Sequence, residues 1–240
     1  MISYLFHTIV YDPLYNGLVY LVGAIPSHDM GLAVIALTIV ARIIIYPLSK
    51  RAIQTQMAMK KITPEVEKIK EKYKDNREEQ GRAIFALYRE RDVHPFASFG
   101  LILIQFPVLI GLYWVFYAGG LPQVDPTLLY SFVHMPTAIN MEFLGAIDMG
   151  QRSLLIAVLA AITQMVYSRL SMGPRGSQTP TEATLSSDMA RSFDLQARYV
   201  LPILIGVIGY TITAAAPLYW ITSNLFMIGQ EFAAGRRWRG

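Results

Sequence analysis

The chain has 240 residues, of which 53% are apolar and only 16% are charged, and its formal net charge is +4. A sequence so poor in polar side chains suits a bilayer better than water, which argues against a soluble globular domain. The absence of cysteine excludes disulfide bonds, thiolate metal sites, a cysteine nucleophile and a lipid-modified cysteine. The first residues contain no Lys or Arg and no small-residue cleavage site follows them, so we expect the N-terminus to be retained.

The N-terminal segment, residues 1–30, predicts an interfacial helix. Pro13 to Ile25 alternates apolar and small residues and ends before a polar stop. Tyr11, Tyr15 and Tyr20 are available to sit at the depth of the lipid headgroups. We therefore expect this helix to lie on the outer face of the membrane, ahead of the first span.

Long apolar stretches predict five transmembrane helices. Crossing a hydrocarbon core of about 30 Å takes about 20 mostly apolar residues in a helix. Residues 199–234 are too long for one span and contain Pro217, which cannot continue a helical hydrogen-bond ladder, so they are divided into two. The expected spans are residues 31–48, 96–118, 152–170, 199–214 and 215–234.

The distribution of Lys and Arg predicts how these spans are oriented. Residues 48–94 contain 12 of them, the loop 171–198 three more and the tail 235–240 another three. Residues 1–30 and 120–150 contain none, and cytoplasmic loops favour Lys and Arg. We therefore expect the N-terminus outside and the C-terminus in the cytoplasm. The segments expected in the cytoplasm are 49–95, 171–198 and 235–240, and the loop 119–151 is expected outside.

Residues 49–95 predict a cytoplasmic hairpin of two antiparallel amphipathic helices. Apolar side chains recur at helical spacing, Thr63 with Pro64 marks one helix start, and Asn76 with Glu79 marks the next. The charges form either a solvated face with ion pairs or a docking surface for anionic headgroups or ribosomal RNA, and both readings stay open. No motif for a specific nucleic-acid sequence occurs. The candidate docking residues are Lys60, Lys61, Lys68, Lys72 and Arg77 with the tail residues Arg236, Arg237 and Arg239.

Arg42 is the most informative residue of the first span. It lies eight residues before Lys50, which places it about 12 Å inward from the basic boundary by helical rise. A charge at such depth costs about 2.5 to 3.5 kcal/mol, so it should face protein or water. It either snorkels to the headgroups, pairs with a neighbouring span or lines a hydrated cavity that attracts an anion. Glu231 is the only carboxylate within any expected span and lies near its cytoplasmic end, which favours the cavity.

Four further polar side chains fall within the expected spans, and no catalytic motif accompanies them. Each of the four forms interhelical hydrogen bonds or, together with Arg42, lines a polar groove. The sequence contains no GxSxG elbow, HExxH pair, phosphate loop or dinucleotide fingerprint, and its histidines do not gather on one side of the membrane. We expect no enzymatic activity, metal, cofactor or small-molecule substrate. The four residues are Gln105, Gln164, Asn224 and Gln230.

The sequence resembles the YidC membrane protein insertases, relatives of the mitochondrial Oxa and chloroplast Albino proteins. The resemblance covers roughly Pro13 to Glu231, without the family's large outer domain, and its corner at Thr213 to Ala215 departs from the usual one. The segments that carry it are Arg42 with three isoleucines and Tyr46 to Leu48, Ala86 to Tyr88, Val93 to Pro95, Leu103 to Pro107, Leu112 with Tyr113, and Tyr219 to Leu225.

The resemblance implies an all-α polytopic membrane protein of the bacterial inner membrane that inserts nascent membrane proteins into the lipid bilayer. It implies a groove open to the cytoplasm and to lipid, centred on Arg42 and lined by Gln105, with Gln164, Asn224 and Tyr46 as further candidates. The ribosome and the Sec translocon are candidate partners. Two rivals stay open: an anion transporter or channel with Arg42 as counter-ion, and a scaffold that assembles membrane proteins without inserting them.

Overall fold

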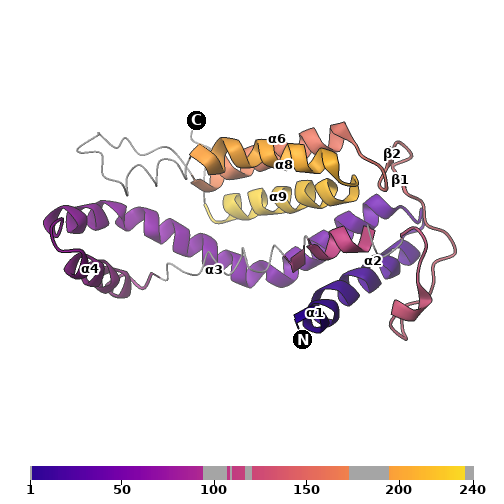
Figure 1. Cartoon of the computed structure of the whole chain (residues 1–240), viewed down its shortest axis with the longest axis horizontal. Coiled ribbons are helices and arrows are strands. Elements are labelled where there is room, and N and C mark those ends of the chain that lie inside the picture. Colours follow the sequence, from indigo (N-terminus) through magenta and orange to yellow (C-terminus); the bar gives the residue numbers. More distant parts are fainter. Residues whose placement is uncertain (1, 94–106, 109, 117–120, 173–194, 236–240) are drawn as a thin grey trace. The chain divides into compact units, whose positions relative to one another are not determined.

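The computed structural model describes residues 2–93, 107–108, 110–116, 121–172 and 195–235 (Figure 1). Contacts divide the chain into a first unit, Met1–Ile44 with Pro107–Gly240, and a second unit, Ile45–Phe106. Gln105, Arg236, Arg237 and Arg239 fall outside the described residues, as does most of the loop 171–198.

The described elements are mostly helices. In chain order they are α1 (Ile2–Phe6), the π-helix η1 (His7–Tyr11), α2 (Asp12–Ala24), α3 (Met30–Lys72), α4 (Arg77–Glu90), the 3-10 helix η2 (Pro126–Leu128), β1 (Glu142–Phe143), β2 (Ile147–Asp148), α6 (Leu154–Met172), the π-helix η3 (Gln196–Val200), α8 (Leu201–Thr211) and α9 (Ala215–Ala233).

The described part of the chain is predominantly helical, and two of its helices are long and apolar enough to cross a membrane. The most apolar stretch of α3 has a mean hydropathy of 2.2, and that of α6 has 1.6. A turn separates α8 from α9, which carries Pro217 in its first turn, where the missing N–H has no helical partner to lose. The arrangement of five spans stays a prediction.

Helix α3 runs without interruption from Met30 to Lys72. Pro47 and Pro64 lie inside it, so the helix start predicted at Thr63 and Pro64 is wrong. Pro64 is exposed, where water can satisfy the carbonyl that its ring displaces, and the helix is already nucleated on both sides. A proline therefore marks a helix start only where the preceding residues do not themselves favour a helix.

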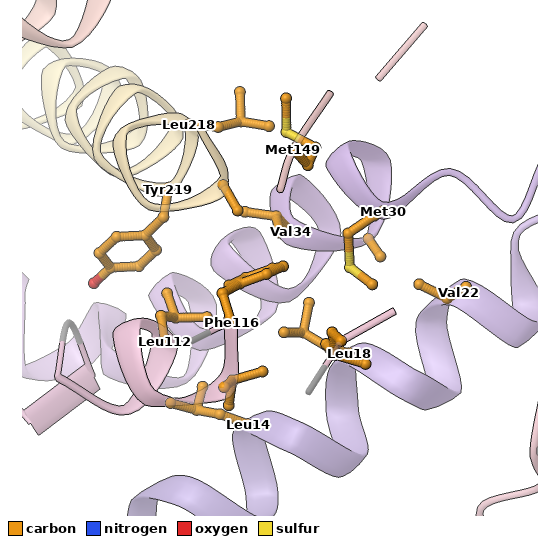
Figure 2. Packing of buried hydrophobic residues seen from close by; sticks show 14 of the residues in the cluster. Leu14, Leu18, Val22, Met30, Val34, Leu112, Phe116, Met149, Leu218 and Tyr219 are labelled. Carbon is orange, nitrogen blue, oxygen red and sulfur yellow. The ribbon is translucent and has the colours of Figure 1, made fainter. Parts of the chain in front are cut away.

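The apolar core of the first unit lies between α2, the first turns of α3, residues 110–116 and the start of α9. Leu14, Leu18 and Val22 recur along one face of α2 and contact this core. Figure 2 shows these side chains beside those from α3 and α9, with Phe116 between them. The residues labelled there are Leu14, Leu18, Val22, Met30, Val34, Leu112, Phe116, Met149, Leu218 and Tyr219. Of the three tyrosines expected at headgroup depth, Tyr11 and Tyr15 are buried here, whereas Tyr20 is exposed.

The segment from residue 121 to 153 is tied to α2 and α3 by side chains that bond to its backbone. Asn16 donates to the carbonyl of Leu128 at 2.9 Å and accepts the amide of Tyr130 at 2.7 Å. Asp29 accepts the amides of Leu32 at 3.0 Å and Leu144 at 2.8 Å, so it joins the first turn of α3 to the β1–β2 hairpin. The segment is thus a structured cap, named the loop cap below.

Helix α6 packs closely against α8 and α9 (Figure 1). A Cβ atom on Gly206 would lie 3.1 Å from Cβ of Ala161, and one on Gly209 would lie 3.3 Å from Cβ of Pro217. Glycine at these positions lets α8 approach its neighbours more closely than a larger residue would. The amide of Ala214 donates to the carbonyl of Gln151 at 2.8 Å, which fixes the α8–α9 turn to the loop cap.

Candidate functional site

The site is centred on Arg42, which lies on the first unit's part of α3 and is 7% exposed. Its Nη2 donates a hydrogen bond to Oγ of Ser223 on α9. Tyr219, one turn before Ser223, and Tyr167 on α6 lie near enough to interact electrostatically with the guanidinium. The helical spacing of Tyr219 and Ser223 places both on the same face of α9. Two helices, α6 and α9, therefore contribute polar side chains around a buried arginine on α3.

Polar contacts continue between α6 and α9. Asn224 is buried, and its Nδ2 donates to Oγ1 of Thr163 at 3.4 Å, which links the two helices. Gln164 is also buried, but its Nε2 bonds Oγ of Ser168 at 3.3 Å within α6 itself. The interhelical bond expected of such residues is therefore present for Asn224, whereas the bond from Gln164 to Ser168 lies within one helix.

The other predicted site residues have different surroundings. Tyr46 belongs to the second unit and is 40% exposed, with its carbonyl accepting a bond from Ser49 Oγ at 3.0 Å. Gln105 lies outside the described residues. The five candidate docking residues of the second unit are exposed, and they are Lys60, Lys61, Lys68, Lys72 and Arg77.

Charged side chains of the second unit form exposed ion pairs. Arg91 Nη2 lies 2.8 Å from Glu65 Oε2, which connects the residue after α4 to α3. Arg82 and Glu78, one turn apart on α4, lie 2.6 Å apart. Asn76 caps α4 by accepting the amide of Glu79 at 3.2 Å, as the sequence indicates. Exposed ion pairs and exposed basic side chains thus occur in the same unit, and the docking role stays a prediction.

Comparison with known proteins identifies the family. The family model described as the 60Kd inner membrane protein matches residues 22–239. The chain is 30% identical to the membrane protein insertase MisCA of Bacillus subtilis over 90% of this chain and 74% of that one. The chain belongs to the YidC family of membrane protein insertases.

Other YidC relatives differ in length. The chain is 29% identical to the YidC insertase of Clostridium tetani, covering 85% of this chain and 81% of that protein. It is 27% identical to the YidC insertase of Methylobacillus flagellatus, of which it covers only 33%. The resemblance to the YidC family inferred from the sequence is therefore confirmed. Membership of this family makes the chain a membrane protein.

The YidC family membership agrees with the apolar surface of the helices. Leu155, Val158 and Ile162 recur on α6 and are each largely exposed, and α8 carries a similar exposed face. Contiguous apolar surface of this extent is rare on soluble monomers, and lipid is the solvent that covers it without cost. The exposed apolar residues of α8 include Leu201, Ile203, Leu204, Val207 and Ile208.

The structure adds one residue to the predicted site and shows two further charged residues to be buried. Ser223 is the hydrogen-bond partner of Arg42, yet a serine in a span ordinarily indicates only local bonding to its own helix. Its position four residues after Tyr219 and next to Asn224 is the signal that could have found it. Arg198, expected in a cytoplasmic loop, is buried at η3, and Glu231 is only 1% exposed.

Proposed function

We propose that the chain is a membrane protein insertase that accepts hydrophobic segments of nascent membrane proteins in a polar groove around Arg42 and releases them laterally into lipid. The observation that carries this proposal is Arg42 itself. A cation is kept 7% exposed within an apolar helix and hydrogen-bonded to Ser223, in a chain whose relatives are named insertases. A charge maintained where it is costly supports a role in binding.

The physical role proposed for Arg42 is to attract the acidic tail that precedes or follows a hydrophobic segment. Two opposite charges 4 Å apart interact by about 4 kcal/mol at an effective dielectric constant of 20, against about 1 kcal/mol in bulk water. A hydrated recess around Arg42 also shortens the apolar distance that a polar tail must cross. Hydroxyl and amide groups such as Ser223 and Asn224 would solvate the tail on its way.

Release needs no chemical step in this proposal. With the cytoplasm negative, the membrane potential favours outward movement of an acidic tail by about 2.3 kcal/mol per charge per 100 mV. The hydrophobic segment then leaves sideways, because lipid solvates it as well as the protein does. Gln105 and Tyr46 are proposed to line the same path, together with Gln164.

The proposed orientation places the N-terminus outside the bacterial inner membrane and the C-terminus in the cytoplasm, following the distribution of Lys and Arg. The exposed lysines of α3 and Arg77 would then face the emerging chain. The tail residues Arg236, Arg237 and Arg239 are proposed to contact the ribosome. A Sec translocon is a further candidate partner.

The test is insertion of a short single-spanning substrate with an acidic tail into proteoliposomes, read by protection of the tail from protease. Arg42→Ala should reduce insertion about tenfold, equivalent to about 1.4 kcal/mol of lost attraction. Arg42→Lys should retain most of the activity because the charge is kept. Arg152→Ala, which removes an exposed arginine, is the matched control and should leave insertion unchanged.

The decisive comparison uses substrates that differ only in the charge of the tail. The loss caused by Arg42→Ala should be largest for acidic tails and small for neutral ones, because only the former interact with a cation. Equal insertion by Arg42→Ala and the parent across the series would refute the role of Arg42. No difference between the parent and empty liposomes under a membrane potential would favour an assembly scaffold instead.

A further inference from the structure

The turn of the β1–β2 hairpin presents a leucine in a backbone conformation that leucine rarely adopts. Leu144 has φ of +52° and Gly145 has φ of +70°, and only glycine enters this region freely. Asparagine is the usual second choice because its side chain bonds locally. A bulky apolar residue persists in this conformation only where the surrounding structure holds its backbone.

The backbone and the side chain of Leu144 have different surroundings. Leu144 is 70% exposed, so its side chain removes little apolar surface from solvent within the described chain. What holds its backbone is Asp29, whose Oδ2 accepts the amide of Leu144 at 2.8 Å. The backbone of Leu144 is therefore stabilised within the chain, whereas its apolar side chain is presented to the surroundings of the described residues.

The hairpin is fixed at the end of a membrane-spanning helix. Asp29 also accepts the amide of Leu32 in the first turn of α3, and the ring of Phe143 packs against Gly31 where a Cβ atom would collide. The amide of Met30 donates to the carbonyl of Asn140 at 2.8 Å. Leu144 is thus held level with the start of α3, which is the depth of the membrane interface for a helix of this apolar character.

We propose that Leu144 is a lipid anchor that inserts into the interfacial region of the leaflet next to the loop cap. The chain continues from β2 into α6, whose first residues Leu154 and Leu155 are themselves largely exposed and apolar. Leu144 would add a further apolar side chain to those that the start of α6 exposes to lipid. This inference depends on the membrane setting of the chain and not on its insertase activity.

The experiment exploits the absence of cysteine from the sequence. Leu144→Cys in the full chain is labelled with a polarity-sensitive fluorophore and reconstituted into phosphatidylcholine and phosphatidylglycerol vesicles. Gln123→Cys, an exposed position elsewhere in the loop cap, is the matched control. We expect lipids carrying a shallow nitroxide to quench the probe at position 144 several-fold more than at 123, and iodide in the buffer to quench it several-fold less.

A second label guards against a folding defect at the strained position. Ala146→Cys places the probe in the same turn while leaving Leu144 in place, and it should show the same preference for lipid quenching. Iodide quenching at 144 and 146 equal to that at 123 would overturn the proposal. Emission that is shielded from iodide but insensitive to lipid quenchers would also overturn it, since it would indicate that a protein covers the turn.

Discussion

The loop cap and the second unit of this insertase hold their shape with different kinds of polar contact. The loop cap is held by Asn16 and Asp29, which are nearly inaccessible to solvent and bond to backbone groups of the loop cap that are far away in sequence. In the second unit, ion pairs such as Arg91 with Glu65 remain 48% and 41% exposed. Removing a buried partner leaves groups unsatisfied away from water, whereas water replaces an exposed partner. The comparison predicts a graded series of mutational effects.

The largest effect is expected at Asn16. Asn16→Ala removes bonds to the carbonyls of Asp12 and Leu128 and from the amide of Tyr130, and leaves these groups partly buried. We expect a loss of about 2 to 4 kcal/mol in the free energy of unfolding, measured by thermal or denaturant unfolding in detergent. Gln123→Ala, exposed in the same loop cap, should change it by less than about 0.5 kcal/mol. Similar small losses for both variants would show that the loop cap is not held by Asn16.

Next in size is the effect of removing the partner of Arg42. Ser223→Ala takes away a hydrogen bond to a buried charge, which contributes about 1.5 to 3 kcal/mol. We expect lower stability together with weaker insertion of acidic-tailed substrates, because the guanidinium loses the group that orients it. Thr222→Ala is the control, since the Thr222 hydroxyl donates to the carbonyl of Leu218 on its own helix at 2.9 Å. Insertion unaffected by Ser223→Ala at the parent's protein level would contradict the orienting role.

Local sequence features predict the helical membrane character of the chain, the importance of Arg42 and the start of α4. The first two follow from the cost of placing polar groups in a bilayer. Arg42 stands out within an apolar run, since a charge there is costly whatever the fold. The Asn76 cap is equally local, because the amide it accepts is three residues away. Both inferences need only the nearest stretch of sequence.

What the sequence does not reveal depends on distant partners. The bond from Arg42 to Ser223 joins residues 181 positions apart, and that from Asp29 to Leu144 joins residues 115 apart. A serine in a span ordinarily bonds its own helix, and only the spacing of Ser223 from Tyr219 and Asn224 could have indicated that it reaches Arg42 instead. The short β1–β2 hairpin also escapes the expectation of an all-α chain, since its strands are two residues long. The helix start predicted at Pro64 was wrong because the residues on both sides of this proline continue one helix, α3, despite the local signal.

A smaller effect is expected for the ion pair of the second unit. A double-mutant cycle with Arg91→Ala and Glu65→Ala should give a coupling energy of no more than about 0.5 kcal/mol, because both side chains stay hydrated. The coupling should shrink further at high salt, which screens exposed charges. A coupling above about 2 kcal/mol would mean that this pair behaves like the buried contacts of the loop cap.

The smallest effect is expected at Asp125, an exposed carboxylate within the loop cap. The Thr127 hydroxyl and then its backbone amide donate to Oδ1 of Asp125, at 2.7 and 2.8 Å, and they hold the pKa of this carboxyl below its ordinary 3.8. Because the folded pKa is lowered, the contribution to stability is present above that ordinary value and is lost as the pH falls through the folded pKa. Thr127→Val should raise the pKa towards 3.8 without reaching it, since the backbone bond remains. Carboxyl carbon chemical shifts followed through an acid titration measure this directly, and an identical titration midpoint in Thr127→Val and the parent would assign the whole shift to the backbone.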